Sequence, residues 1–226
     1  MVSPKIMKGA FVQLAQGLVS IEPNVVVFQY NPEKLTQGLT PWNPFEGDQA
    51  QRGAQAPNVQ PFNPKETFSL VLELDAADGL ASGDPLTLAS GIAPQIAALK
   101  KLTLPTQGVL GDLVASAQAL VGSASTNAVR PTVPILLFMW GPGLILPVRI
   151  TSFSVEVSLF SPLLDPLQAK VTIALEVLTP DLFKCREDAA VKIAKAAYNM
   201  TKTNENALAL LNISNSAQSV LGMLPI

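Results

Sequence analysis

Acidic residues beside turn formers are the first candidates for chemistry in this chain. Two carboxylates can act as general acid and general base when a cleft raises the pKa of one of them. Glu22, Glu33, Asp75, Asp78 and Asp165 each lie in or beside a turn-forming stretch. Acid–base chemistry needs a cleft, which a sequence does not show, and turn acids are usually solvated. We therefore interpret these residues as solvated turn acids.

Glycine-containing turns are the next candidates, for binding an ion or a phosphate. Asp78-Gly79 and Gly83-Asp84-Pro85 place carboxylates beside glycines. Their spacing does not match the twelve-residue calcium loop with its closing Glu. Gly141-Pro142-Gly143 lacks the glycine spacing, the lysine and the following helix of a phosphate-binding loop. Solvated turns are the favoured interpretation of all three stretches.

The histidine and cysteine content limits the chemistry further. The chain has no histidine, which removes the commonest general base and the commonest metal ligand. Its single cysteine, Cys185, excludes an intramolecular disulfide and a zinc site made of cysteine and histidine. No serine lies in a G-x-S-x-G elbow. We expect no enzyme, with no catalytic, cofactor-binding or metal-binding residues.

The composition favours a subunit of an assembly. Of 226 residues, 48% are hydrophobic and only 14% are charged, against roughly 25% in soluble domains. A free monomer with so little charge would expose apolar surface and associate. The apolar runs 133–140 and 144–148 are far shorter than the ~20 residues of a spanning helix, so we expect no direct membrane insertion. A net charge of −2 with scattered Lys and Arg argues against nucleic acid.

Alternating hydrophobicity in the second half predicts the centre of an antiparallel sheet. Residues 133–140 form an apolar run, and residues 149–159 alternate between two faces. Residues 170–177 alternate again, after a connector whose prolines are incompatible with a central strand. We predict three consecutive strands. The face of the middle strand that we expect to be dry comprises Arg149, Thr151, Phe153, Val155, Val157 and Leu159.

The rest of the chain predicts further strands and helices around this sheet. Residues 8–21 and 25–30 are expected to form a hairpin, and residues 66–74 a clean strand. Residues 87–104 predict an amphipathic helix, and residues 109–121 a helical or disordered piece. The fold class is therefore mainly β with flanking α-helices.

The domain organisation follows from these elements. Residues 1–180 are expected to form one β domain, with an irregular insertion at 36–65 and a helical insertion at 87–121. Residues 181–226 are expected to form a C-terminal helix, at 186–200, and a tail that is either a docking arm or frayed. The aromatic residues of the irregular insertion either anchor it to its own domain or dock on a neighbouring subunit. These candidate inter-subunit contacts are Trp42, Phe45 and Phe62.

Two separated patches of the sequence resemble the tube-like baseplate protein family of contractile injection systems. Residues 28–35, Phe-Gln-Tyr-Asn-Pro-Glu-Lys-Leu, are similar to the F-x-F-N-P-E-x-L opening of that family. Residues 138–171 are similar to its F-x-W-G, strand, L-F-x-x-x-G-x-P-L-R-A run. The candidate core and fold signature comprises Phe28, Asn31, Pro32, Trp140, Gly141, Phe153, Phe160 and Pro166.

The resemblance implies a β-sandwich or barrel of the phage tail-tube type with a helix, in a subunit of a six-fold ring. Family members include tube initiators and a baseplate adaptor with a C-terminal LysM module. The implied partners are copies of this chain, the inner tube protein, the spike hub and the baseplate wedge proteins. Here Leu164-Asp165 replaces the usual Asp-Gly turn, Gln168 stands where arginine is common, and no LysM repeat is evident after Pro180.

A structural ring subunit at the junction of inner tube and baseplate or spike is the leading hypothesis. Ring closure between identical subunits would also cover the edges of a weakly charged sheet. One alternative is the inner tube protein of the same machine. Another is a ligand-binding β-barrel with an apolar cavity around Phe153 and Trp140. The leading hypothesis places the chain in the bacterial cytoplasm during assembly and then in a large contractile particle.

Two tryptophan substitutions test this interpretation. We expect Trp42→Ala to leave a folded subunit with weakened assembly, because the aromatic ring would be lost from an interface rather than from the core. Trp140→Asp should prevent folding, because it introduces a charge into the sheet. Circular dichroism and size-exclusion chromatography measure both effects. Normal ring formation by the Trp42 variant would refute a docking role for the insertion.

Overall fold

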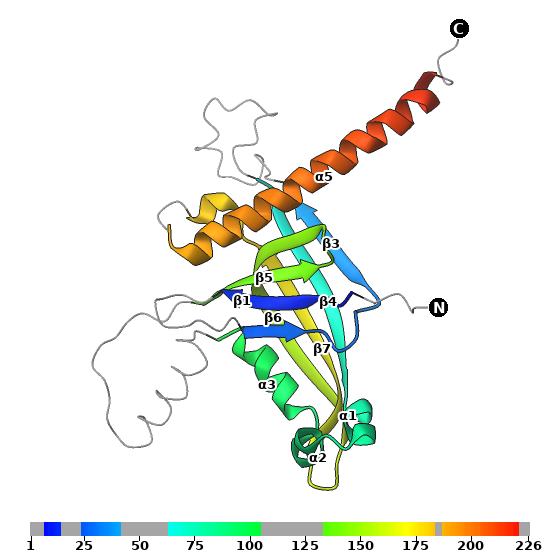
Figure 1. The fold of residues 1–226 in the computed structure, drawn as a ribbon, viewed down its shortest axis with the longest axis vertical. Coiled ribbons are helices and arrows are strands. Elements are labelled where there is room, and N and C mark those ends of the chain that lie inside the picture. The colour runs from blue at the N-terminus through cyan, green and yellow to red at the C-terminus, as the bar shows by residue number, and fades with distance from the viewer. Residues whose placement is uncertain (1–6, 15–23, 42–62, 105–132, 184–186, 222–226) are drawn as a thin grey trace, which may run out of the picture.

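Strands form most of the structure. The computed structural model describes residues 7–14, 24–41, 63–104, 133–183 and 187–221. In this part of the chain, strands form one antiparallel seven-stranded sheet in the order β2-β1-β5-β6-β7-β4-β3 (Figure 1). The strands are β1 (Ala10–Leu14), β2 (Asn24–Val27), β3 (Leu35–Thr40), β4 (Lys65–Asp75), β5 (Ile135–Trp140), β6 (Leu144–Phe160) and β7 (Pro166–Val177).

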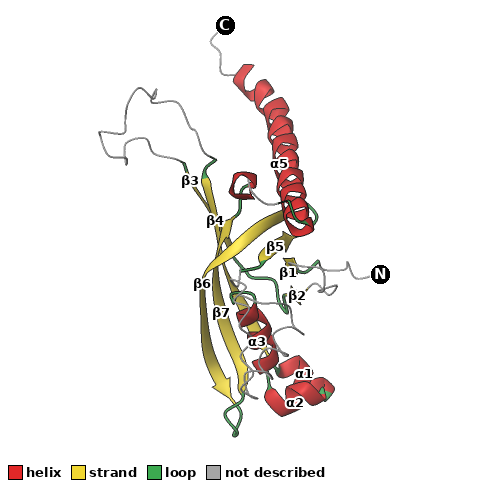
Figure 2. Cartoon of the chain, turned by 90° about the vertical axis from the view of Figure 1, so that its left-hand side faces the viewer, coloured by secondary structure: helices red, strands yellow, loops and turns green. Residues whose placement is uncertain are grey.

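Helices flank the sheet at both ends of the molecule. They are α1 (Ala77–Ser82), α2 (Pro85–Ser90), α3 (Ala93–Lys101), the 3-10 helix η2 (Pro180–Phe183) and α5 (Ala189–Leu221). In Figure 2, α1 and α2 lie near the β6–β7 turn, and α5 projects from the opposite end. The prediction of a mainly β fold with flanking α-helices is confirmed.

The sheet is open but strongly curled. β2 and β3 follow each other in the chain, yet they form its two opposite edges. In a flat sheet these edges would be roughly 29 Å apart, at about 4.8 Å per strand. Residues 28–34 alone connect them, and this stretch spans about 27 Å only when fully extended. Because the chain also bends at residues 29–30, the two edges must lie much closer together than in a flat sheet.

Phenylalanine rings fill the space that the curled sheet encloses. Phe11, Phe28, Phe68 and Phe138 are all 2% exposed or less. The ring centroids of Phe11 lie 5.1 Å from Phe28 and 5.7 Å from Phe138. Phe68 of β4 lies 5.7 Å from Phe138 of β5, although β6 and β7 separate these two strands in the sheet. The two halves of the sheet therefore pack face to face across one aromatic core.

The connection between the two edges is fixed by side chains that bond to backbone. The side-chain amide of Gln29 donates to the Asp75 carbonyl (2.7 Å) and accepts from the Asp75 N–H (3.1 Å), as a neighbouring strand would. Asn31 accepts from the Gly9 N–H and donates to the Met7 carbonyl, both at 2.9 Å. These four bonds tie the connection to the end of β4 and to the chain before β1.

The predicted faces were wrong in part of the middle strand, β6, because the strand contains a β-bulge. Strict alternation over 149–159 would place Arg149 and Thr151 on the dry face with Phe153, but both are exposed. The register against β7 shifts between Ile150 and Ser152, which inserts Thr151 as an extra residue and reverses the phase of the strand. Only the run from Phe153 follows the predicted pattern, and Leu159 at its end is exposed.

Element boundaries differ from the predictions at four other places. Residues 36–40 of the expected irregular insertion belong to β3, which pairs with β4. The expected helix at 87–104 is divided at Gly91 (φ 57°), because the next amide, that of Ile92, donates to the Pro166 carbonyl instead of continuing the helix. The expected Asp78-Gly79 turn lies within α1, and the helix expected at 186–200 continues to Leu221. The piece at 109–121 lies outside the described residues.

The Gln29 bonds generate a stability prediction. We expect Gln29→Ala to lower the free energy of unfolding by about 2 kcal/mol, because two partly buried hydrogen bonds are lost. Gln95→Ala, at an exposed position on α3, is the matched control and should change it by less than about 0.5 kcal/mol. Urea denaturation measures both values. Equal stabilities of the two variants would show that this side chain does not fix the connection.

Candidate functional site: two exposed apolar surfaces

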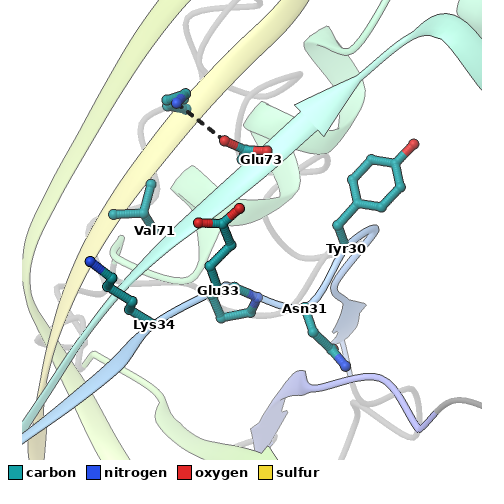
Figure 3. A pocket seen from close by; sticks show the side chains of 8 residues that line it. Tyr30, Asn31, Glu33, Lys34, Val71 and Glu73 are labelled. Atoms are coloured by element: carbon teal, nitrogen blue, oxygen red, sulfur yellow. Dashed lines mark ion pairs between the residues drawn. The ribbon is translucent and has the colours of Figure 1, made fainter.

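A charged hollow beside the β2–β3 connection is the first candidate for acid–base chemistry. It has a volume of about 270 Å³ and is lined by Tyr30, Asn31, Pro32, Glu33, Lys34, Val71, Glu73 and Lys170 (Figure 3). Lys170 and Glu73 form an ion pair at 3.2 Å, and both side chains are more than half exposed. Such a pair contributes little stability in water. The charges of this hollow are solvated, as the turn-acid interpretation expects for Glu33.

Tyr30 is not activated for catalysis. Its hydroxyl donates to the Asp78 carboxylate at 2.9 Å. This hydrogen bond, with burial and the negative charge of Asp78, raises the pKa of Tyr30 above 10.0. A tyrosine base needs a lowered pKa, so the geometry works against proton abstraction. Among the described residues, no group of three His, Cys, Asp or Glu side chains could hold a metal ion.

Helix α5 is attached to the sheet by an apolar surface on its first turns. Asp188 caps the helix by accepting from the Val191 N–H at 2.9 Å. Ala190, Val191 and Ala194 are buried. They pack in a second core cluster with Leu14, Ile135, Leu137 and Phe183. Small side chains at this spacing let the helix lie close to the sheet.

A polar clamp continues the attachment where the apolar surface ends. We define the clamp as Thr201, Lys202 and Asn204. The buried Thr201 hydroxyl donates to the Ile145 carbonyl (2.7 Å) and accepts from the Ile145 N–H (3.0 Å). Among the described strands, none lies on this side of β6 at Ile145, because the pairing with β7 begins at Val148. Thr201 therefore satisfies the backbone of β6 where a strand is missing.

The charged part of the clamp contains a buried carboxylate. Lys202 contacts Glu66 (3.0 Å) and Glu205 (2.8 Å), and Glu66 is only 4% exposed. Gln37 of β3 also donates to Glu66, at 2.7 Å. Burial by itself lowers the pKa of Lys202, but hydrogen bonds to Glu205 and Glu66 outweigh it and raise the pKa above 10.5. The clamp thus connects α5 to β3 and β4.

The arm, defined as residues 204–221, is the first exposed apolar surface. After Asn204, which donates to the Gly143 carbonyl at 3.3 Å, the helix projects away from the sheet (Figure 2). At 1.5 Å per residue it extends for about 27 Å. Leu208, Leu210 and Ile213 are 57%, 66% and 62% exposed. No charged residue occurs between 206 and 226, so no charged side chain of this stretch favours the solvation of the surface.

The hairpin tip, defined as residues 159–165, comprises the last two residues of β6 and the turn to β7, and it is the second exposed apolar surface. Leu163 and Leu164 are 85% and 77% exposed, and Leu159 and Phe160 are also exposed. Leu86 and Leu88 of α2 are exposed at the same end of the molecule (Figure 1). The arm and the hairpin tip therefore place apolar side chains at opposite ends of the long axis.

The residues of the predicted fold signature lie in the core, in turns and at the surface. Phe28 is buried, and Trp140 and Phe153 pack against the main core, with Trp140 stacked on Phe138. Gly141 adopts a left-handed φ of 70° in the β5–β6 turn. Phe160 is 51% exposed at the hairpin tip rather than in the core. Asn31 fixes the β2–β3 connection, Pro32 lines the hollow, and Pro166 begins β7.

Several predicted residues lie outside the described part of the chain, and comparison with known proteins found no match. Trp42, Phe45, Phe62 and Cys185 lie outside the described residues. The hairpin tip was not predicted, although consecutive leucines in a proline-containing turn were a signal for it. The chain matches no protein-family model and no curated protein. Within the described residues, no helix combines the length and apolarity that crossing a membrane requires.

The Lys202 pair generates a pH-dependent prediction. Lys202→Met should lower the free energy of unfolding by about 3 kcal/mol at pH 7, because Glu66 stays buried without its cation. A raised pKa means that the contribution of Lys202 is complete below pH 10.5 and is lost as the pH rises further. The difference between wild type and variant should therefore shrink above pH 10.5.

Urea denaturation between pH 7 and the alkaline range measures this difference. Lys192→Met, at an exposed position on the same helix, is the control and should have little effect at either pH. A wild-type advantage that stays constant above pH 10.5 would contradict the assignment.

Proposed function

We propose that this protein is a structural ring subunit of a contractile injection system, at the junction of the inner tube and the baseplate or spike. There it acts as a tube initiator or a baseplate adaptor. It assembles with copies of itself in a six-fold ring, and with the inner tube protein, the spike hub and the baseplate wedge proteins. Its role is mechanical and involves no chemical reaction.

The arm is the observation that carries this proposal. A helix that extends for about 27 Å from the clamp, with exposed leucines and no charged residue after Glu205, is costly for a monomer in water. The polar clamp holds its base rigidly, so the arm has a defined direction rather than a swinging one. A helix that is fixed at one end and apolar at the other is suited to docking on a neighbouring subunit.

The residues that resemble the baseplate family support the proposal. The Asn-Pro pair at 31–32 lies in the connection that joins the two edges of the sheet. Trp140 packs on the aromatic core, and Gly141 forms the turn after it. These positions lie in and beside one open, curled sheet, whereas the resemblance implies a β-sandwich or barrel.

The exposed strand edges also suit a ring. β2 pairs only with β1 and β3 only with β4 among the described strands, so each leaves one backbone edge unpaired there. Ring closure covers such edges without open-ended aggregation. The alternative role as inner tube protein shares this requirement. The arm at one end and the hairpin tip at the other favour a terminal ring, whose two faces meet different partners.

Electron microscopy of the purified protein tests the proposal. Negative-stain images should show six-fold rings. Leu210→Glu with Ile213→Glu should leave the fold intact but reduce ring formation, because charges then occupy the exposed positions of the arm. Asn206→Glu, an exposed polar position on the same arm, is the control. A monomeric wild-type protein would overturn the proposal, and long stacked tubes would favour the inner tube alternative.

A further inference from the structure

The buried carboxylate of Glu66 bonds to two elements that lie far apart in the sequence. Its Oε1 atom accepts from the side-chain amide of Gln37 on β3 at 2.7 Å. Its Oε2 atom accepts from the Lys202 ammonium on α5 at 3.0 Å. Glu66 lies on the same face of β4 as Phe68 and Leu70, and it is only 4% exposed. One buried charge therefore depends on a strand at the edge of the sheet and on the helix that carries the arm.

β3 is attached to the sheet by little besides its hydrogen-bond ladder with β4. It forms one edge of the sheet, and four of its six residues are exposed. Within this strand, only Leu35 packs against the main core. Apart from the Gln37 bond, one side-chain bond joins β3 to another described residue: the Thr67 hydroxyl donates to the Gly38 carbonyl at 3.5 Å, which is long for a hydrogen bond. An edge strand with so few buried contacts opens locally at a low free energy, while the two halves of the sheet stay packed.

Lys202 makes the paired position of β3 compatible with the charge of Glu66. Leu39 of β3 lies opposite Glu66 in the ladder, so a paired β3 contributes to the burial of this carboxylate. Loss of one partner of a buried ion pair is strongly destabilising, because the other charge stays buried without compensation. A detached β3 instead exposes Glu66 to water, which solvates the charge. Without Lys202, the equilibrium therefore moves from the paired towards the detached state of β3.

Lys202 lies where the attachment of α5 to the sheet ends. The apolar part of the attachment, which includes Val191 and Ala194, lies roughly two to three helical turns before it. Beyond the clamp the helix projects away from the sheet (Figure 2). A sideways displacement of the arm therefore acts on the clamp before it acts on the apolar part, and it withdraws Lys202 from Glu66.

We infer that Glu66 couples the position of α5 to the pairing of β3: the strand stays paired while the clamp end of the helix lies on the sheet, and displacement of that end releases it. β3 is the two-state element, paired or detached, and Lys202 biases it towards the paired state. The coupling is reciprocal, so detachment of β3 weakens the contact between Glu66 and Lys202. Detachment also exposes the backbone edge of β4 at residues 65–70, which a paired β3 covers. The coupling lies within one chain and does not depend on the proposed ring.

Hydrogen–deuterium exchange of the full chain, measured by mass spectrometry, tests this coupling. Lys202→Met should accelerate exchange of the β3 amides by about tenfold or more, because the charge of Glu66 then favours the detached strand. The amides of β2, the opposite edge, should change by less than about twofold, since the clamp bonds to β4, β6 and the β5–β6 turn instead. Lys192→Met, at an exposed position on the same helix, is the matched control and should leave both edges unchanged.

Two results of this experiment would overturn the inference. Equal acceleration of β2 and β3 in Lys202→Met would show a general loss of stability. Unchanged exchange of the β3 amides would show that the strand does not depend on the ion pair.

Thr201→Val tests the position of the helix without changing the ion pair. Thr201 bonds to Ile145 of β6 and not to β3, so its loss loosens the clamp end of α5 from the sheet. The β3 amides should exchange about threefold faster or more, although no contact of that strand is altered. Thr203→Val is the matched control, because this hydroxyl donates to the Asn199 carbonyl within the helix, and it should not affect β3. Unchanged β3 exchange in Thr201→Val would contradict the coupling.

A double substitution separates the charge of the lysine from the packing of its side chain. Lys202→Met with Glu66→Gln removes both charges, while the new amide oxygen still accepts from Gln37. Exchange of the β3 amides should then return to within about threefold of the wild-type rate, because no buried charge favours detachment. Exchange as fast as in Lys202→Met alone would show that the lysine stem, and not its charge, holds β3, and would overturn the inference.

Discussion

The short connection between β2 and β3 is the constraint on which the rest of the structure depends. Residues 28–34 join strands at opposite edges of the sheet, so the sheet has to curl until its halves face each other. Curling brings Phe68 of β4 against Phe138 of β5 and creates the aromatic core. Gln29 and Asn31 then replace strand pairing with side-chain bonds at the join. The edges that remain unpaired are a consequence of this geometry.

Local pattern was sufficient to predict most of the strands, though not β3, because burial on one face imposes a period of two wherever the ladder is regular. The predicted faces of β6 were wrong where one residue changes the phase of the alternation. Thr151 reads as part of an alternating run, yet it is the extra residue of a bulge that only the register against β7 reveals. The curl of the sheet could not be predicted from the sequence either, because it depends on which strands form the edges and not on the composition of any strand.

For the helices too, the local pattern predicted that they exist, whereas tertiary contacts determine where they begin and end. Gly91 and the Ile92–Pro166 bond divide the expected helix at 87–104, and that bond joins residues far apart in sequence. The polar stretch after Met200 reads as a tail, but no glycine or proline interrupts residues 189–221, and Thr201 and Lys202 bond to the sheet. The exposed leucines of the arm and the tip follow no period that marks a surface. Their position on the surface therefore became visible only in the structure.

The length of β6 has a consequence for how the molecule comes apart. Its first residues pair with β5 and the rest pair with β7, so one continuous strand belongs to both halves of the sheet. Neither half can melt alone without tearing hydrogen bonds from the backbone of the other. Partial opening is therefore suppressed, and the core loses its order in a single cooperative step. Under mechanical load, the core of such a sheet either holds or fails as a whole.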